Sequence, residues 1–232
     1  MKNILLIGGS YGIGLAIAKE LQYENKVFVA SRTNEEIAEM HVTHIPFDAT
    51  TDTLDTSKLP ETIDGLVYCP GSINLRPFKG LKPDAFESDL QINFISLVKV
   101  IQSVLPNLTA SNQSSIVLFS SVAASMGMPF HTSVAAAKGA IEGFAKALAA
   151  EYAPKIRVNV IAPSLTDTPL ADKFLNNDVK REKSAERHPL KRVGTSEDMA
   201  QMASFLLSEK SSWISGQIFH VDGGMSTLLV NQ

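Results

Sequence analysis

Hydrophobic and polar positions along this chain fall into blocks that predict alternating strands and helices. Short, nearly continuous apolar runs are typical of parallel strands that are covered on both faces. Seven such runs are predicted as strands: Asn3–Ile7, Lys26–Ala30, Thr43–Phe47, Asp64–Cys69, Ser115–Ser120, Ile156–Ile161 and Gln217–Val221. Helical spacing of apolar residues covers Gly12–Glu24, Pro83–Leu108, Val134–Tyr152 and Glu197–Leu207, and more loosely Leu170 to Arg187. This succession predicts an α/β fold built on a doubly wound parallel sheet.

Two segments depart from a regular alternation. The stretch from Asp48 to Ile63 is short for a helical crossover and is rich in turn formers, so we expect an abbreviated helix there or none. The helix over Ala135–Ala150 is crowded with alanine and glycine, which let another backbone approach closely. It either packs deeply inside the monomer or pairs with a symmetry mate. No linker or repeat interrupts the chain, so residues 1–232 are expected to form a single domain.

Composition narrows the classes of function. The chain has 232 residues and a formal net charge of −3, so its composition does not indicate the basic surface of a nucleic-acid-binding protein. The apolar run Ile4–Ile7 is too short for a signal peptide, and no run approaches the ~18 residues of a membrane span. The single cysteine, Cys69, excludes an internal disulfide and fits a reducing compartment. We therefore expect a cytoplasmic protein with no nucleic-acid or membrane partner, and we predict no metal site.

The first candidate site is a cluster of glycines close to the amino terminus. The first strand runs directly into Gly8, Gly9, Gly12 and Gly14, and a helical pattern begins at once. A strand, a glycine turn and a helix place backbone N–H groups and a helix N-terminus against a pyrophosphate. The spacing differs from the commoner G-x-G-x-x-G fingerprint, and a plain strand–helix turn is the alternative. The position of the cluster favours a dinucleotide.

Further short motifs are spaced along nearly the whole chain. They are Gly8–Gly14, Asp48-Ala49, Tyr68–Gly71, Asn93, Ser120-Ser121, Lys138, Arg157–Pro163 with Thr168, His188–Gly194, Ile214–Gln217 and Val221–Gly224. Taken together, these motifs resemble those of the short-chain dehydrogenase/reductase family. Two of them depart from the family pattern: Ile7 stands where the family has the threonine of Thr-Gly-x-x-x-Gly-Ile-Gly, and Tyr68–Gly71 keeps only the glycine of Asn-Asn-Ala-Gly.

The resemblance implies a Rossmann-type sheet of seven strands in the order 3-2-1-4-5-6-7, with helices on both faces and a bound nicotinamide dinucleotide. The residues that it implies for cofactor binding are Gly8, Ser10, Tyr11, Gly12, Ile13, Gly14, Ser31, Arg32, Thr33, Asp48, Ala49, Pro70, Gly71, Lys138, Pro163, Thr166 and Thr168. Family members are commonly tetramers or dimers, so a homo-oligomer is expected.

The end of the second strand bears on the choice between NAD and NADP. An NAD-binding protein places a carboxylate there for the ribose 2′-hydroxyl. This chain instead has Ser31-Arg32-Thr33, and its first acidic residue is Glu35. A guanidinium between two hydroxyls suits a 2′-phosphate, because arginine can bind phosphate through two hydrogen bonds. We predict NADP(H); an ordinary surface arginine is the alternative.

The resemblance also implies catalytic roles. In the family, a serine binds the carbonyl oxygen, an asparagine holds a water, and a lysine holds the ribose and lowers the pKa of a tyrosine four residues before it. Ser121, Asn93 and Lys138 match the first three. Each has a structural alternative: Ser121 could end a strand with a turn-forming hydroxyl, Asn93 could cap or bend its helix, and Lys138 could pair with Glu142.

The tyrosine itself is absent from this sequence. Counting back four residues from Lys138 gives Val134, and the thirteen residues from Ser121 to Val134 match the family spacing. Valine cannot donate a proton. Another group could supply it, and His131 is the nearest candidate, although it could equally be a solvated loop residue; Ser133 and a water held by Lys138 or Asn93 are others.

Three interpretations therefore remain for the whole chain. It could be a reductase with an atypical proton donor, a regulatory or partner subunit that binds NADP without turnover, or a scaffold that has lost its cofactor. The retained motifs argue against the third. We expect an NADP(H)-dependent oxidoreductase that reduces a ketone or a 3-oxoacyl thioester, both small-molecule carbonyl or acyl substrates.

Overall fold

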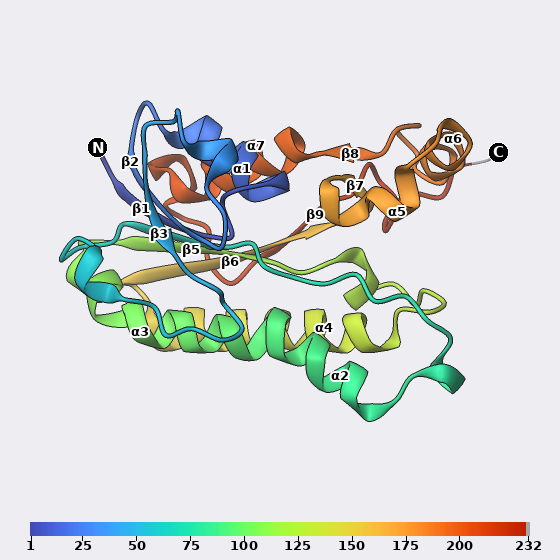
Figure 1. Cartoon of the computed structure of the whole chain (residues 1–232), viewed down its shortest axis with the longest axis horizontal. Helices are drawn as coiled ribbons and strands as arrows, with labels where there is room; N and C mark the ends of the chain where they lie inside the picture. Colours follow the sequence, from blue (N-terminus) through green and yellow to red (C-terminus); the bar gives the residue numbers. More distant parts are fainter. Residues whose placement is uncertain (231–232) are drawn as a thin grey trace.

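The computed structural model describes residues 1–230, in which seven parallel strands form one sheet with helices on both faces (Figure 1). The strands are β1 (Asn3–Ile7), β2 (Lys26–Ser31), β3 (Val42–Pro46), β4 (Gly65–Tyr68), β5 (Ser114–Phe119), β6 (Ile156–Pro163) and β9 (Ile218–Val221). Their order is β3-β2-β1-β4-β5-β6-β9. Because β9 is the seventh strand of this sheet along the chain, the predicted fold class and strand order are confirmed. A separate two-stranded pair, β7 (Thr166–Asp167) with β8 (Gly194–Thr195), was not predicted.

Two helices cover one face of the sheet. They are α3 (Ser96–Ala110) and α4 (Thr132–Tyr152), and they lie below the sheet in Figure 1. Alternate strand residues such as Leu66 and Ile116 point to this face and pack with Val104 and Ile141 of the helices. The alanine-rich helix α4 thus packs inside the monomer through one face. Its glycines Gly139 and Gly143 have open space where a Cβ would stand.

The opposite face carries α1 (Gly12–Leu21) and α7 (Ser196–Leu207). The intervening strand residues, such as Leu6 and Val117, pack there with Ile17 and Leu206. Successive side chains of β1 and β5 therefore alternate between two apolar cores, one on each face of the sheet. This arrangement explains why these strands read as continuous apolar runs in the sequence.

The helix predicted over Pro83–Leu108 is interrupted in the structure. It consists of α2 (Pro83–Leu90), a π-helical turn (Gln91–Ile95) and α3. A π-turn accommodates one extra residue, and such turns are frequent at functional sites. The apolar spacing gave no sign of the interruption, because each part keeps its own helical period. The whole segment, Pro83–Ala110, is long and apolar enough to span a membrane, but in this fold the apolar side chains of its α3 part, such as Leu97 and Val104, are buried in the core.

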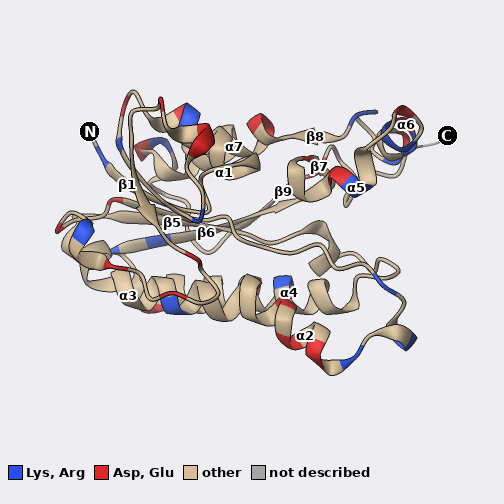
Figure 2. Cartoon of the chain, in the orientation of Figure 1, with Lys and Arg blue, Asp and Glu red and all other residues tan. Residues whose placement is uncertain are grey.

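The connections differ in how much helix they contain. Between β3 and β4 there is only the short 3₁₀ turn Thr56–Lys58, as expected for this crossover. The loose region after β6 contains α5 (Asp172–Leu175) and α6 (Asp178–Glu186), which Figure 1 shows at the end of the molecule away from the amino terminus. These two helices are the mixed-charge elements at that end in Figure 2. They stand over the carboxyl ends of the central strands, where open α/β sheets bind ligands.

Candidate active site

Two adjoining cavities lie at the carboxyl ends of the strands. The larger has a volume of about 480 Å³ and the smaller of about 330 Å³. Ile13, Cys69, Gly71, Thr168 and Leu170 line both cavities, so the two meet along a common wall. All the residues that the sequence predicted for cofactor binding line one cavity or the other. Three of the four residues predicted for catalysis, Ser121, His131 and Lys138, line the larger one, and Asn93 is buried outside it.

The smaller cavity is built around the glycine turn. Gly8 and Gly12 adopt positive φ angles of 76° and 56°, which are strained for residues with a side chain. A Cβ on Gly14 would lie 2.2 Å from the Gly8 carbonyl oxygen, so only glycine lets α1 start this close to β1. Tyr11 caps α1 without a side-chain hydrogen bond, and the first turn of the helix has no acidic residue. The free N–H groups at this end are therefore available to an anion.

The side of this cavity next to β2 is polar. Ser31 donates its hydroxyl to the Thr33 carbonyl over 2.7 Å, and Thr33 shares a hydrogen bond of 3.1 Å with Ser10. Ser31 thus shapes the turn rather than presenting a free hydroxyl. The Arg32 side chain is 64% exposed and lies 4.0 Å from an Asp48 carboxylate oxygen, so its guanidinium is free to bind an anion at the cavity mouth.

Asp48 and Ala49 form the next part of the wall. Asp48 accepts hydrogen bonds from the hydroxyl and the backbone N–H of Thr50, and these bonds, with a smaller contribution from Arg32, lower the pKa of its carboxyl. It is therefore an ionised acceptor. Pro70 and Gly71 close the wall after β4, and Pro70 lies directly against Gly8.

Lys138 and Ser121 meet at the larger cavity from different elements. Lys138 on α4 is 8% exposed, and its ammonium donates to the Phe119 carbonyl at the end of β5 over 2.9 Å. Burial lowers the pKa of Lys138 to about 8. The Ser121 hydroxyl accepts from the Ala123 N–H over 3.2 Å, which leaves its own proton free for an acceptor in the cavity. Ser121 thus does cap a turn, as its structural alternative proposed, and can also face a ligand.

Ser120 and Glu142, which lie next to Ser121 and Lys138, bind each other. Ser120 donates to Glu142 over 2.6 Å and also lies within hydrogen-bond distance of the Lys138 carbonyl. No ion pair joins Lys138 to Glu142 among the described residues, so the pairing considered from the sequence is not formed. Val134 lies one helical turn before Lys138, is 6% exposed and presents an apolar surface to the cavity.

Asn93 lies in the π-turn and is fully buried. Its amide nitrogen donates to the Asp89 carbonyl and to the Ser72 hydroxyl, while its Oδ1 has no partner. A Cβ on Gly71 would lie 3.0 Å from this Oδ1 and 3.2 Å from the Lys138 ammonium. The asparagine oxygen and the ammonium therefore converge on the same glycine.

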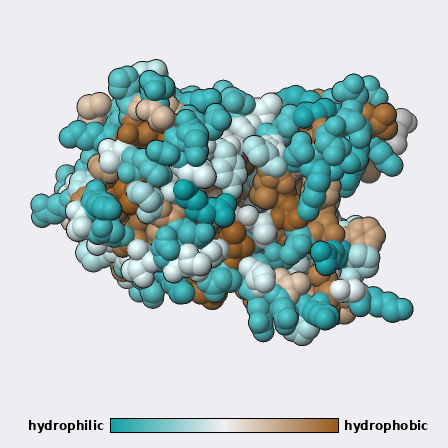
Figure 3. All heavy atoms as spheres, viewed as in Figure 1, coloured by the Kyte–Doolittle hydropathy of each residue, from teal (hydrophilic) through white to brown (hydrophobic). Residues whose placement is uncertain are grey.

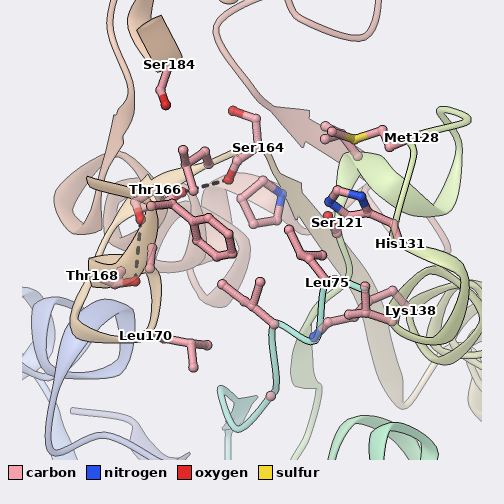
Figure 4. Close-up of a pocket in the computed structure, with 18 of the residues that line it drawn as sticks. Leu75, Ser121, Met128, His131, Lys138, Ser164, Thr166, Thr168, Leu170 and Ser184 are labelled. Carbon is pink, nitrogen blue, oxygen red and sulfur yellow. Dashed lines mark hydrogen bonds between the residues drawn. The ribbon is translucent and has the colours of Figure 1, made fainter. Parts of the chain in front are cut away.

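His131 precedes α4 and lines the larger cavity. Its Nδ1 lies 2.7 Å from the Pro129 carbonyl, which can only accept, so Nδ1 carries a hydrogen. Figure 4 shows the ring on the same wall as Ser121 and Met128, with Thr166 and Thr168 on the opposite wall. The other ring nitrogen, Nε2, has no protein partner among the described residues.

Sequence reasoning missed several residues of this site. The buried Asp89 side chain is hydrogen-bonded to Ser72, which also binds Asn93 and lines the larger cavity, although neither Ser72 nor Asp89 belongs to a recognised motif. The interior of the larger cavity is apolar, and Figure 3 shows apolar residues gathered in a hollow below α5 and α6. Its cationic lining residues are Lys138, Lys173, Lys180, Lys183 and Arg187, and none of the described lining residues is acidic. Spacing along the chain could not have found this set, because the fold assembles it from distant segments.

Pro163, the last residue of β6, and Thr166 and Thr168 beyond it line one wall of the larger cavity. His188 is buried there, with Nε2 2.8 Å from the Ser164 hydroxyl and Nδ1 2.8 Å from the Ser184 carbonyl. Both ring nitrogens of His188 have a hydrogen-bond partner, so this side chain holds the wall of the cavity in place. Within residues 1–230, no group of three or more His, Cys, Asp and Glu side chains is arranged to hold a metal ion.

Comparisons with known proteins agree with this architecture. Residues 8–226 match a family model described as enoyl-(acyl carrier protein) reductase. A 3-oxoacyl-[acyl-carrier-protein] reductase of Chlamydia trachomatis is 32% identical over 243 residues, covering 97% of each chain. Aldohexose dehydrogenase of Thermoplasma acidophilum superposes with a TM-score of 0.89 at 26% identity, over 100% of this chain and 97% of that one.

A third protein shares the fold at a lower identity. Gluconate 5-dehydrogenase of Burkholderia cenocepacia, solved with NADP and tartrate, has a TM-score of 0.89 at 24% identity, over 98% of this chain and 96% of that one. The family match extends over nearly the whole sequence, and both the sheet order and the glycine turn agree with it. The chain belongs to the short-chain dehydrogenase/reductase family of oxidoreductases.

Proposed function

We propose that this protein is an NADP(H)-dependent reductase of a ketone or a 3-oxoacyl thioester. One observation carries the proposal: a free serine hydroxyl and a buried ammonium face one apolar cavity, which adjoins an anion-binding glycine turn. An apolar cavity with a few convergent polar groups is the usual form of a small-molecule site.

The smaller cavity suits NADP(H). The N-terminus of α1 has unused N–H groups for the pyrophosphate, and Gly12 leaves the backbone open to it. Arg32 would hold the 2′-phosphate, with Thr33 beside it and Ser31 fixing the turn, and Asp48 with Ala49 would hold the adenine. Gly71, Pro163, Thr166 and Thr168 would border the nicotinamide end. When bound, the cofactor supplies a hydride to the carbonyl carbon.

The residues in and around the larger cavity have separate roles in the reduction. Ser121 donates its free O–H to the substrate oxygen and so polarises the carbonyl. Lys138 holds the cofactor ribose, and its charge stabilises the negative oxygen that develops. Asn93 presents its unpaired Oδ1 to a water between itself and Lys138. Val134, at the position of the family tyrosine, contributes no proton. The proton must come from another group of the cavity wall, and His131 is one candidate because its Nε2 has no partner among the described residues.

An assay with purified protein tests this function. NADPH is incubated with a panel of ketones and 3-oxoacyl thioesters, and the absorbance of the reduced nicotinamide is followed. We expect slow turnover, because general acid catalysis typically contributes ~10²–10⁴-fold. Val134→Tyr should increase the rate by restoring a phenol one turn before Lys138.

The outcomes separate the proposal from its rival. Turnover by the unmodified chain supports the reductase. Activity that falls in His131→Ala makes this histidine the proton donor, and unchanged activity excludes it. Activity that appears only in Val134→Tyr would favour a regulatory or partner subunit that binds NADP without turnover.

We also propose that the protein is a homo-oligomer, a tetramer or dimer built on the long helices. The outer face of α4 supports this, because Gly139 and Gly143 leave room for a second backbone. Light scattering coupled to size-exclusion chromatography would give the mass, and a monomer at micromolar concentration would contradict the proposal.

A further inference from the structure

A buried carboxyl group lies directly behind the larger cavity. Asp89, on α2, is 1% exposed, and its Oδ1 lies 2.5 Å from the Ser72 hydroxyl oxygen. Its Oδ2 is buried without a partner. Ser72 follows Gly71 and lines the cavity, whereas Asp89 does not. The carboxyl group therefore reaches the cavity only through the serine hydroxyl.

Asn93 fixes the hydrogen bonding of this pair. Its amide nitrogen uses both hydrogens, one on the Asp89 carbonyl over 2.8 Å and one on Ser72 Oγ over 2.9 Å. The Ser72 oxygen thus accepts from Asn93 and keeps one lone pair and one hydrogen. When Asp89 is ionised, Ser72 donates its hydrogen to the carboxylate. When Asp89 carries a proton, Asp89 can donate to Ser72, and the serine hydrogen is free to point into the cavity.

We propose that Ser72 and Asp89 form the acid–base pair that replaces the absent phenol. This inference rests on the proposed carbonyl reduction. As the carbonyl carbon is reduced, its oxygen takes the hydrogen of Ser72, the Ser72 oxygen takes the proton of Asp89, and Asp89 is left as a carboxylate. After product leaves, Asp89 regains a proton from water through Ser72, so the net consumption is one proton. Alcohol oxidation runs the same steps in reverse. Ser72 is then a catalytic residue, and Asp89 acts through it.

A purely structural role would predict different behaviour. If Asp89 only tied the loop after β4 to α2, an amide at this position would serve as well, because it can still hydrogen-bond Ser72. An amide cannot carry the proton. Asp89→Asn therefore separates the two roles with nearly unchanged shape. Glu87→Gln is its matched control, because it makes the same chemical change at an exposed position of the same helix.

Single-turnover rates with NADPH and a carbonyl substrate that the protein reduces test the pair. We expect Asp89→Asn and Ser72→Ala each to lower the rate by roughly 10²-fold, with the melting temperature of Asp89→Asn nearly unchanged. Glu87→Gln should keep the original rate. Normal turnover by Asp89→Asn in an otherwise active enzyme overturns the inference but leaves the reductase function intact. A loss in His131→Ala in that case moves the proton to the histidine.

Infrared spectroscopy gives a readout that needs no turnover. A protonated carboxyl group has a C=O stretch that a carboxylate lacks. We expect the difference spectrum between the unmodified protein and Asp89→Asn, both cofactor-free and at the pH of the assay, to contain such a band, and the difference spectrum with Glu87→Gln to lack it. Lys138 on α4, Tyr68 in β4 and Cys69 after β4 have no such band, and the band of the Glu142 carboxyl on α4 is common to both spectra and cancels in the difference. If the unmodified protein reduces nothing, the proposed function fails. A spectrum without an Asp89 band then overturns the acid–base pair as well.

Discussion

The two cavities meet at Gly71, yet they are built in different ways. The smaller one is made mostly of backbone: a glycine turn, the start of α1 and the ends of β2 and β4. The larger one is made of side chains from β5, α4, the loop after β4 and the segment after β6. A site whose glycine turn must keep its backbone conformation tolerates few substitutions in that turn. A site made from separate side chains can lose one member, as at Val134, and still keep its shape.

The strongest way to break the backbone-built cavity is Gly14→Ala. The added Cβ would lie 2.2 Å from the Gly8 carbonyl oxygen, so α1 must move away from the turn. We expect NADPH binding to fall below detection and the free energy of unfolding to drop by roughly 1–3 kcal/mol. Calorimetric titration and thermal unfolding measure the two effects. Gly80→Ala is the control, because a Cβ there has nothing within 4 Å. Equal binding by both variants would contradict this description of the turn.

Lys138→Met tests the side-chain cavity, and we expect opposite effects on activity and stability. Turnover should fall by roughly 10²-fold or more because the charge beside the substrate oxygen is lost. Burial lowers the pKa of Lys138 from 10.5 to about 8, so the unfolded chain binds more protons between these values and stability rises with pH there. Below about pH 8 the full cost of the buried charge is present.

The methionine variant removes that cost. At pH 7 it should be more stable by about 1–2 kcal/mol, after allowing for the lost hydrogen bond to Phe119. The advantage should shrink as the pH rises above about 8. Thermal unfolding over a pH series measures this, with Lys146→Met, exposed on the same helix, as the control. A methionine variant that is less stable than the unmodified protein at every pH would show that burying the Lys138 ammonium does not destabilise the fold.

The smallest effect on cofactor binding is expected at Arg32, at the mouth of the smaller cavity. Arg32→Ala should weaken NADPH binding about tenfold, because its side chain is 64% exposed and its attraction to phosphate is screened. NADH binding should not change. Fluorescence titration with both cofactors measures the ratio, and Arg76→Ala, which is exposed and lines neither cavity, is the control. Equal losses for the two cofactors would mean that Arg32 does not discriminate between them.

Much of the fold could be predicted because its signals are local. The strand β1 and the glycine turn lie within one short segment, and their order alone predicts a strand, a turn and a helix. The pairing of β6 with β9 was less direct and came from the family resemblance. The π-turn at Gln91–Ile95 could not be predicted, because the apolar period continues on both of its sides.

The candidate site was predictable only in part, for the same reason. Lys138 and Ser121 were found through their spacing within one family. Ser72 and Asp89 are separated by the loop after β4 and by the start of α2, and no pattern links them in the sequence. Only the folded chain brings their oxygens to 2.5 Å. The polar environment that surrounds the missing phenol therefore had to be read from the structure.

The π-turn makes the length of this segment as important as its composition. Successive residues of an α-helix are rotated by about 100° around its axis. Deleting one residue from Gln91–Ile95 would allow a regular helix but would turn all of α2 by that angle relative to α3. Asp89 would then face away from the loop after β4, even though every side chain of the pair was retained. Insertions and deletions here should therefore be rarer among functional descendants of this chain than amino-acid replacements.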